Sequence, residues 1–154
     1  MGERRAAAER LRDAEFAAFA AGAAGRLLHA ATLLTGDRDE GSELLFAALS
    51  RTYADWFRLR GEDPYVHTRG EIVRRFALRP RWRRPRGGLL GTLTVQERLV
   101  VVLRLYEGIA EEQTAAQLGM PVDRVRAVCL RATTVLRNPR PSAGPAPRVR
   151  EAAS

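Results

Sequence analysis

The chain has 154 residues but no lysine, a single cysteine and few aromatic residues (6%). One cysteine cannot form a disulfide bond within the chain, so we expect Cys129 to be a small buried side chain and the protein to occupy a reducing, cytoplasmic compartment. The two histidines, His29 and His67, have no cysteine or carboxylate cluster at ligand spacing, and the sequence contains no glycine-rich phosphate loop. These absences argue against an enzyme, and we expect no catalytic residue, no metal site and no cofactor.

The charge of the chain is concentrated in one segment. The formal net charge is +8, and all 26 basic residues are arginine. The preference for arginine over lysine occurs together with a high alanine content, and both are typical of a GC-rich coding sequence. The arginine content is therefore weak evidence for a binding function by itself. The location of the charge says more, because residues 69–86 hold eight arginines against one acidic residue, Glu71, and carry a net charge of +7.

The N-terminus does not resemble a targeting signal. Arg4 and Arg5 are followed at once by Glu9, Asp13 and Glu15. The alanine-rich run beyond them is too short for a membrane helix. We therefore expect neither an export signal nor membrane insertion.

The N-terminal half has the pattern of several packed helices. Helical spacing covers residues 3–24 and 26–34, with Gly22 and Gly25 as candidate breaks. An amphipathic helix follows Ser42, and a further helix with a basic outer face covers residues 65–77. The apolar stripe of the amphipathic helix is formed by Leu44, Leu45, Ala48, Leu49, Thr52, Tyr53, Trp56 and Phe57. We expect this stripe to be the core of the N-terminal domain.

The C-terminal half is organised around a predicted helix-turn-helix. Apolar residues from Val95 to Tyr106 recur at helical spacing and indicate a support helix that is buried on most sides. A short helix over residues 111–118 ends at Gly119, and Pro121 begins the last helix.

These segments predict an all-α protein with two small helical domains. The first covers residues 1–84 and the second residues 94–138. Residues 85–93 are a proline- and glycine-rich linker between them. Residues 139–154 are too rich in proline, alanine and glycine to fold, so we expect a disordered tail.

The last helix carries a candidate DNA-binding face. Its apolar positions fall on one side of a helical wheel, and Asp123, Ala127 and Thr134 lie on the opposite side. Arginines flank that opposite side, and the DNA-binding candidates are Arg124, Arg126, Ala127 and Arg131. A helix held by two others can enter the DNA major groove, where arginine bridges guanine acceptors or phosphates. The alternative is an ordinary three-helix bundle with solvated arginines.

A second basic candidate precedes the linker. Residues 79–86, RPRWRRPR, place Trp82 among five arginines. This composition suits binding to nucleic-acid phosphates with one ring free to stack on a base. Together with the preceding helix, the segment offers as DNA-binding candidates Arg74, Arg75, Arg81, Trp82, Arg83 and Arg84. The alternative is a basic solvated linker whose tryptophan packs into the core.

The order of these pieces resembles the extracytoplasmic-function (group IV) sigma factors of the sigma-70 family, over residues 15–137. The N-terminal half is similar to sigma region 2 through LLTGDRDEGSELLFAALSRTYADWFRLRGEDPYV. The C-terminal half is similar to region 4 through LTVQERLVVVLRLYEGIAEEQTAAQLGM and VRAVCLRA. The resemblance implies a transcription initiation protein whose partners are core RNA polymerase and promoter DNA, with an anti-sigma factor as a candidate partner.

Three features depart from the family pattern: the polymerase-clamp stretch, which makes region 2 degenerate, the linker, and the recognition helix, where Ala127 and Val128 replace polar or basic residues common in the family. The stretch that matches the family's polymerase-clamp contact, usually Asp-Leu-Val-Gln-Glu, has Phe46 and Ala47 at its two last positions. The resemblance implies polymerase binding by Glu43, Leu44, Phe46 and Ala47. The nine-residue linker spans at most about 30 Å, which is short for promoter elements roughly 60 to 70 Å apart. Two alternatives therefore stay open: a degenerate sigma-like regulator acting through protein-protein interaction, and a self-standing helix-turn-helix DNA-binding regulator.

Overall fold

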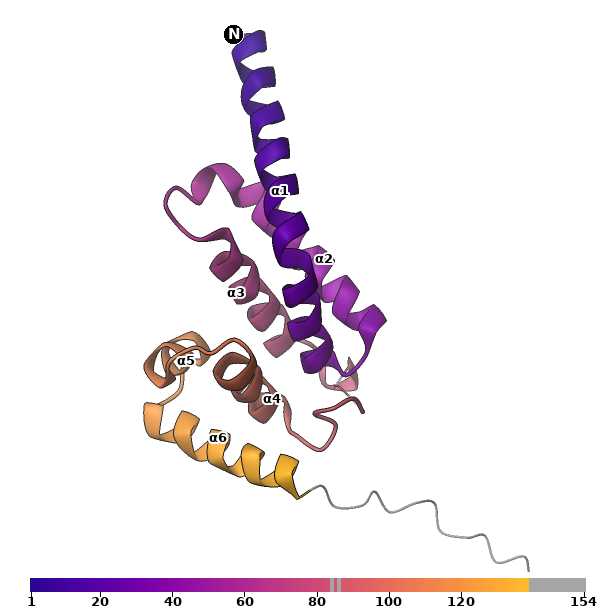
Figure 1. Cartoon of the computed structure of the whole chain (residues 1–154), viewed down its shortest axis with the longest axis vertical. Helices are drawn as coiled ribbons and strands as arrows, with labels where there is room; N and C mark the ends of the chain where they lie inside the picture. The colour runs from indigo at the N-terminus through magenta and orange to yellow at the C-terminus, as the bar shows by residue number, and fades with distance from the viewer. Residues whose placement is uncertain (84, 86, 139–154) are drawn as a thin grey trace, which may run out of the picture.

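Every regular element of the described chain is a helix, which confirms the all-α prediction (Figure 1). The computed structural model describes residues 1–83, 85 and 87–138. The longer helices are α1 (Gly2–Thr35), α2 (Arg38–Asp55), α3 (Pro64–Ala77), α4 (Val95–Val101), α5 (Glu111–Leu118) and α6 (Val122–Arg137). The short ones are η1 (Trp56–Arg58), η2 (Arg81–Arg83) and the π-helical η3 (Val102–Tyr106). The predicted disordered tail, residues 139–154, lies outside the described residues.

Helix α1 is one continuous helix, so the break considered at Gly22 and Gly25 does not occur. Its first turns project beyond the other helices, whereas Leu27 and Leu34 near its end are buried (Figure 1). The helix contains an 18-residue window with a mean hydropathy of 1.3, of which 28% is buried. By length and composition it could therefore cross a membrane, which corrects the estimate that the alanine-rich run is too short.

The turn between α1 and α2 is formed by Gly36 and Asp37, so α2 begins at Arg38 and not after Ser42 as the sequence predicted. Gly36 ends α1 in the left-handed conformation, with φ of 76°. Asp37 then caps α2, because its Oδ1 accepts a hydrogen bond from the Glu40 amide at 2.9 Å. The backbone of Gly88, in the connector, lies so close to Gly36 that a Cβ at position 88 would be 2.8 Å from the Gly36 Cα. The connector is thus folded against the α1–α2 turn.

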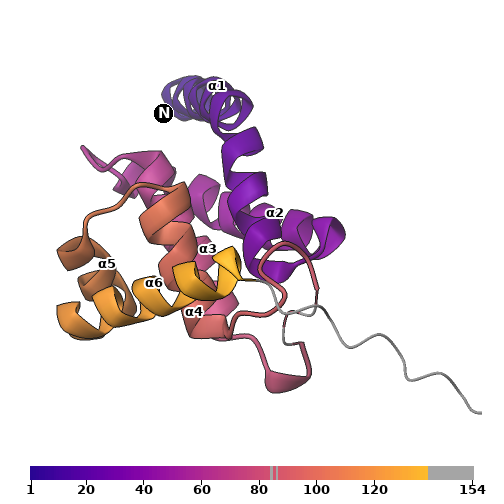
Figure 2. The same ribbon diagram turned by 60° about the horizontal axis from the view of Figure 1, so that its bottom comes forward.

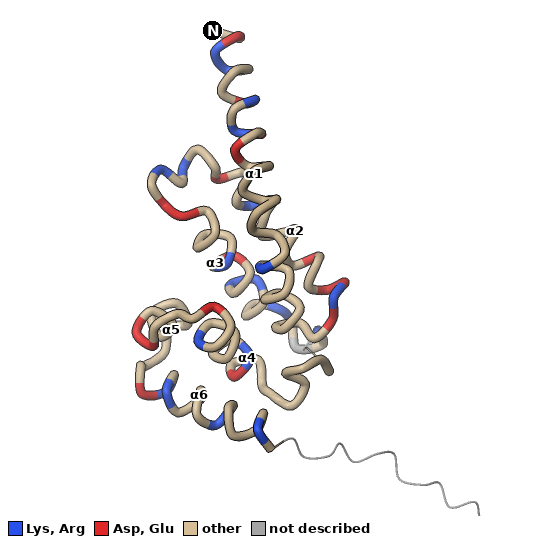
Figure 3. Tube along the Cα trace, viewed as in Figure 1, with Lys and Arg blue, Asp and Glu red and all other residues tan. Residues whose placement is uncertain are grey.

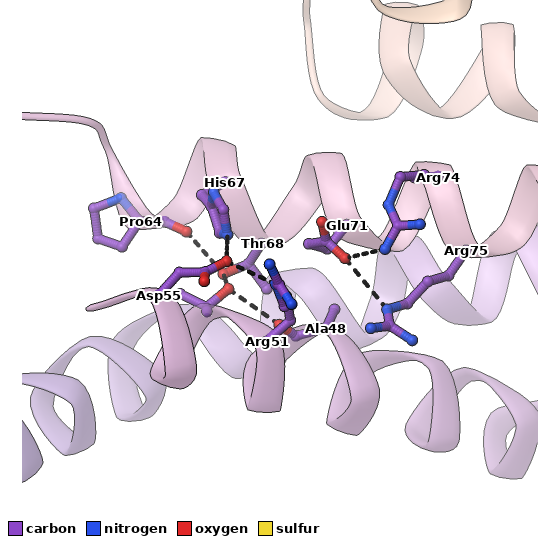
Figure 4. Close-up of polar contacts among 10 residues, drawn as sticks. Ala48, Arg51, Asp55, Pro64, His67, Thr68, Glu71, Arg74 and Arg75 are labelled. Atoms are coloured by element: carbon purple, nitrogen blue, oxygen red, sulfur yellow. Dashed lines mark hydrogen bonds and ion pairs between the residues drawn. The ribbon is translucent and has the colours of Figure 1, made fainter. Parts of the chain in front are cut away.

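Helices α2 and α3 are joined by a polar seam (Figure 4). The hydroxyl groups of Thr52 and Thr68 are buried and lie 2.8 Å apart. One turn further along α2, Asp55 contacts Arg51 at 2.8 Å and His67 at 3.4 Å. The threonine pair and the Arg51–Asp55 pair have hydrogen-bond partners, whereas His67 Nε2 is buried and reaches Asp55 without forming a hydrogen bond. The seam thus links the two helices through polar contacts, of which the threonine pair is the most buried.

The predicted apolar stripe of α2 is buried over most of its length, but Phe57 is 54% exposed. The helix ends at Asp55, and the tighter turn of η1 rotates Phe57 away from the core. This corrects the expectation that the stripe continues to Phe57.

The main hydrophobic core contains residues from both halves of the chain. Leu27, Ile72 and Phe76 of the N-terminal half share one cluster with Leu99 and Leu103 of the C-terminal half. Figure 1 places α4 between α6 and the first three helices, and in Figure 2 α6 crosses in front of α4. Helix α4 contacts α6 as well as α1 and α3. The connector takes part as well, because Leu90 and Leu93 are buried in the same cluster. That the two halves are separately folding domains remains a prediction.

Candidate nucleic-acid interface

The predicted support helix is formed by α4 and η3. It begins with a capping box, in which Thr94 Oγ1 accepts from the Glu97 amide at 3.2 Å and Glu97 Oε2 accepts from the Thr94 amide at 3.0 Å. The residues between Leu99 and Leu103 are all buried, as expected for a helix with apolar side chains on most sides. The π-helical end then turns the chain toward Gly108 and α5.

The turn of the helix-turn-helix follows from one glycine and one proline. Helix α5 ends at Gly119, which adopts a left-handed conformation with φ of 63° that most side chains would resist. The Met120 amide donates to the carbonyl of Ala115 at 3.0 Å, and Pro121 precedes α6. Val100, Ala115 and Val125 form a small core that fixes α4, α5 and α6 together.

Helix α6 has a buried face and an exposed face. Val125 and Ala132 are buried, and Cys129 is a free, partly buried thiol on the same side. The opposite side is exposed and is formed by Asp123, Arg124, Arg126, Ala127, Leu130, Arg131 and Thr134. The structure therefore brings together all four candidates of this helix. It adds Leu130, which the sequence analysis missed although its position on the helical wheel signals the exposed side.

Basic residues recur along α6 (Figure 3), and the helical wheel places Arg124 and Arg131 on one edge of the exposed face and Arg126 on the other. Arg126 binds Glu111 of α5 at 2.9 Å, and this hydrogen bond raises the pKa of Arg126. On the other edge, Arg131 contacts Glu97 of α4 at 3.2 Å, and Arg124 donates to the Gln96 side chain at 3.2 Å. The three guanidinium groups are exposed and oriented, and such groups can exchange a surface partner for a DNA phosphate at little cost. Glu97 differs from the other two partners, because its side chain is only 8% exposed and also accepts a hydrogen bond from the Thr94 amide.

The basic outer face of α3 is partly neutralised within the chain. Arg74 and Arg75 share the carboxylate of Glu71, at 2.8 and 3.3 Å (Figure 4). The hydrogen bond from Arg74 lowers the pKa of Glu71, so this carboxylate stays charged at neutral pH. Glu71 is already counted in the net charge of +7, so this pairing engages two guanidinium groups without changing the net charge of the segment.

The tract after α3 presents an aromatic ring to solvent. Trp82 is 78% exposed, with the guanidinium of Arg83 lying 5.5 Å from the centre of its ring. The alternative of a tryptophan packed into the core is therefore wrong. The backbone of Arg81 belongs to η2, and Arg84 lies outside the described residues.

The candidate polymerase-binding residues lie on α2. Glu43 and Phe46 are exposed, Ala47 is half-buried and Leu44 is buried in the core. Arg83 approaches Glu43 to 3.7 Å, so this surface adjoins the basic tract. The groups that a partner could reach from solvent are Glu43, Phe46 and Ala47.

An apolar groove separates α3 from the helix-turn-helix. Its volume is about 530 Å³, and its walls include Val73 and Leu78 on one side and Leu118 and Met120 on the other. Gln96, which accepts the hydrogen bond from Arg124, also lines this groove. The α3 and α6 candidates thus lie on opposite sides of it and form two separate basic surfaces.

The support helix, the glycine turn and the exposed arginine-bearing α6 together define a helix-turn-helix of the DNA-binding class. Residues 89–138 match the family described as Sigma-70, region 4. No curated protein matches the chain. The family match covers about a third of the chain, so it identifies the C-terminal part as similar to sigma region 4 and supports a sigma-like DNA-binding function for that part.

Proposed function

We propose that this protein is an extracytoplasmic-function sigma factor that binds core RNA polymerase and directs it to promoter DNA in the cytoplasm. The observation that carries the proposal is the exposed face of α6 within residues that match sigma region 4. In this scheme α6 contacts the upstream promoter element and the first three helices contact the polymerase. The chemistry of RNA synthesis belongs to the polymerase, and this chain supplies recognition.

Run-off transcription with purified core polymerase tests the proposal. The full-length chain is added to core enzyme on genomic fragments, with core enzyme alone as the control. Transcripts that begin at defined positions only when the chain is present support the sigma function. Binding to polymerase without such transcripts would favour the regulator that acts through protein-protein interaction.

Specific observations also favour that second function. The core is continuous between the two halves, and the linker is folded against the α1–α2 turn rather than extended. A sigma factor that reaches two promoter elements needs its halves to separate, whereas a protein-binding regulator does not. An anti-sigma factor is a candidate partner under the sigma proposal.

The α2 surface provides a test of polymerase binding. The variant Phe46→Gln with Ala47→Glu restores the polar groups common in the family, so we expect it to bind core polymerase more tightly than the parent chain. Phe46 is 74% exposed, so the change at this position removes no core contact. Fluorescence titration against core enzyme measures the effect, and Phe57→Gln, at another exposed phenylalanine, is the matched control. Unchanged affinity in the double variant would show that α2 does not form the polymerase contact.

The edges of α6 provide a test of DNA binding. We expect Arg124→Ala with Arg131→Ala to weaken binding to all duplexes alike, because in this proposal both guanidinium groups contact the phosphate walls of the groove. The dependence of log affinity on log salt should become less steep by about 2, close to 0.9 for each lost phosphate contact. Arg4→Ala with Arg10→Ala removes the same charge from the projecting part of α1 and is the control. A change in sequence preference without a change in salt dependence would place these arginines on bases instead.

A further inference from the structure

The middle of the exposed face of α6 has an unusual composition for a DNA-binding surface. Between the two arginine-bearing edges lie Ala127, Leu130 and Thr134. Leu130 is 66% exposed. It belongs to neither hydrophobic cluster of the part of the chain that the structure describes. The fold therefore does not use this leucine, which leaves its side chain available to a ligand.

The polar group nearest to Leu130 on this strip is already engaged. Thr134 Oγ1 donates to the backbone carbonyl of Leu130 at 3.0 Å. Its hydroxyl hydrogen is therefore not free for a base, and Thr134 adds a methyl group to the strip. Asp123, at the start of the helix, is held by Arg126 at 3.2 Å. The centre of the strip thus offers apolar contact and few hydrogen bonds.

One group in the major groove matches such a strip. Each base pair presents hydrogen-bond donors and acceptors there, and thymine alone among the four standard bases adds an apolar C5-methyl group. A leucine side chain placed against the hydrogen-bonding edge of a base would displace water from that edge. The edge would lose its hydrogen bonds to water and gain none from the leucine. Placed against a thymine methyl, it buries apolar surface on both partners.

We propose that α6 recognises thymine through the C5-methyl group, with Leu130 as the principal contact and Ala127 beside it. The arginines on the two edges bind phosphates and thereby fix how deeply α6 enters the major groove and how it is oriented there. This proposal rests on the proposed function, because it requires α6 to enter the major groove. It assigns a base to the DNA site: one or two thymines face the middle of α6.

The test replaces thymine by deoxyuridine, which removes only the methyl group and keeps the base pair. Preferred duplexes are first selected from a random-sequence library with the full-length chain, alone and assembled with core RNA polymerase. Each thymine of the selected duplex is then replaced in turn, and affinity is measured by fluorescence anisotropy. We expect about fourfold weaker binding at one or two positions, the effect of losing one buried methyl group.

The substitution Leu130→Ala identifies the residue responsible. In this variant thymine and deoxyuridine at the sensitive positions should bind almost equally, because the side chain that contacts the methyl group is gone. Since Leu130 is exposed, the substitution leaves the core intact. Leu11→Ala, at a leucine that is 60% exposed on the projecting part of α1, is the matched control and should keep the full difference.

The outcomes separate this inference from the proposed function. A selected duplex with no position sensitive to deoxyuridine, or with a sensitivity that Leu130→Ala leaves unchanged, overturns thymine recognition by Leu130 while DNA recognition stands. A library that yields no preferred sequence in either assembly overturns both. A sensitivity that disappears in Leu130→Ala and persists in Leu11→Ala supports the assignment.

Discussion

The substitution Arg98→Ala is expected to lower the free energy of unfolding by about 4 kcal/mol, because Arg98 is a fully buried side chain whose guanidinium group joins three parts of the fold. It donates to the carbonyls of Leu34 at 3.1 Å, Gly87 at 3.2 Å and Leu93 at 3.4 Å. Leu34 lies at the end of α1, where the helix dipole favours a positive charge. Thermal unfolding followed by circular dichroism measures the loss, which corresponds to a melting temperature about 10 °C lower.

A second variant separates the hydrogen bonds of Arg98 from its volume. Burial lowers the pKa of Arg98, but an arginine stays protonated in proteins, so the site holds a charge. Among the described residues this charge has no carboxylate partner and depends on backbone carbonyls. Arg98→Met fills most of the space without donating, so we expect it to remain nearly as unstable as the alanine variant. A methionine variant as stable as the parent would show that the three hydrogen bonds contribute nothing.

The elements that the sequence predicts well are those with local signals. The apolar periods of α2, α4 and α6 and the turn at Gly119 depend on residues a few positions apart. For that reason the all-α class and the helix-turn-helix follow from the pattern alone. The exposed face of α6 is also local, because the burial of Val125 fixes which side of the helix faces away.

The features that escape prediction depend on contacts between distant residues. Arg98 lies within an apolar run and could equally have been a solvated residue on the outer edge of the support helix. Its burial is decided by the end of α1, 64 positions earlier in the chain. The shared core is similar, since the pattern shows that a face is apolar but does not show what covers it. Leu130 is the opposite case, an apolar residue that is exposed. It was missed because apolar residues of a helix are expected to pack into the core.

The shared core has a consequence for the DNA-binding surface. Helix α4 contacts both α6 and the helices of the N-terminal half. The direction in which α6 faces is therefore set by packing that involves the whole described chain rather than by the helix-turn-helix alone. Variants that loosen the contact between the halves should disturb α6 even though they lie far from it.

Glu107 also joins the two halves of the chain. Its side chain is almost fully buried and accepts hydrogen bonds from the Tyr65 hydroxyl at 2.8 and 3.1 Å. The guanidinium groups of Arg26 and Arg69 approach it to 3.6 and 3.5 Å. Burial, followed by the hydrogen bond to Glu107, raises the pKa of Tyr65, so the phenol stays protonated and remains a donor at physiological pH. One carboxylate of the C-terminal half thus receives groups from α1 and α3.

We expect Glu107→Gln to lower the free energy of unfolding by about 3 kcal/mol, the lower end for a broken buried ion pair, because Arg26 is half exposed and water compensates part of its charge. Tyr65→Phe is the matched comparison, since it removes one hydrogen bond but leaves the carboxylate with both arginines, and we expect a loss of about 1 kcal/mol. Urea unfolding at neutral pH measures both variants. The relative size of the two losses shows which interaction of this cluster stabilises the fold. Equal losses would mean that the tyrosine hydrogen bond dominates and that the arginines contribute no stability. A larger loss in Glu107→Gln would show that the buried charge holds α1 and α3 against the helix-turn-helix.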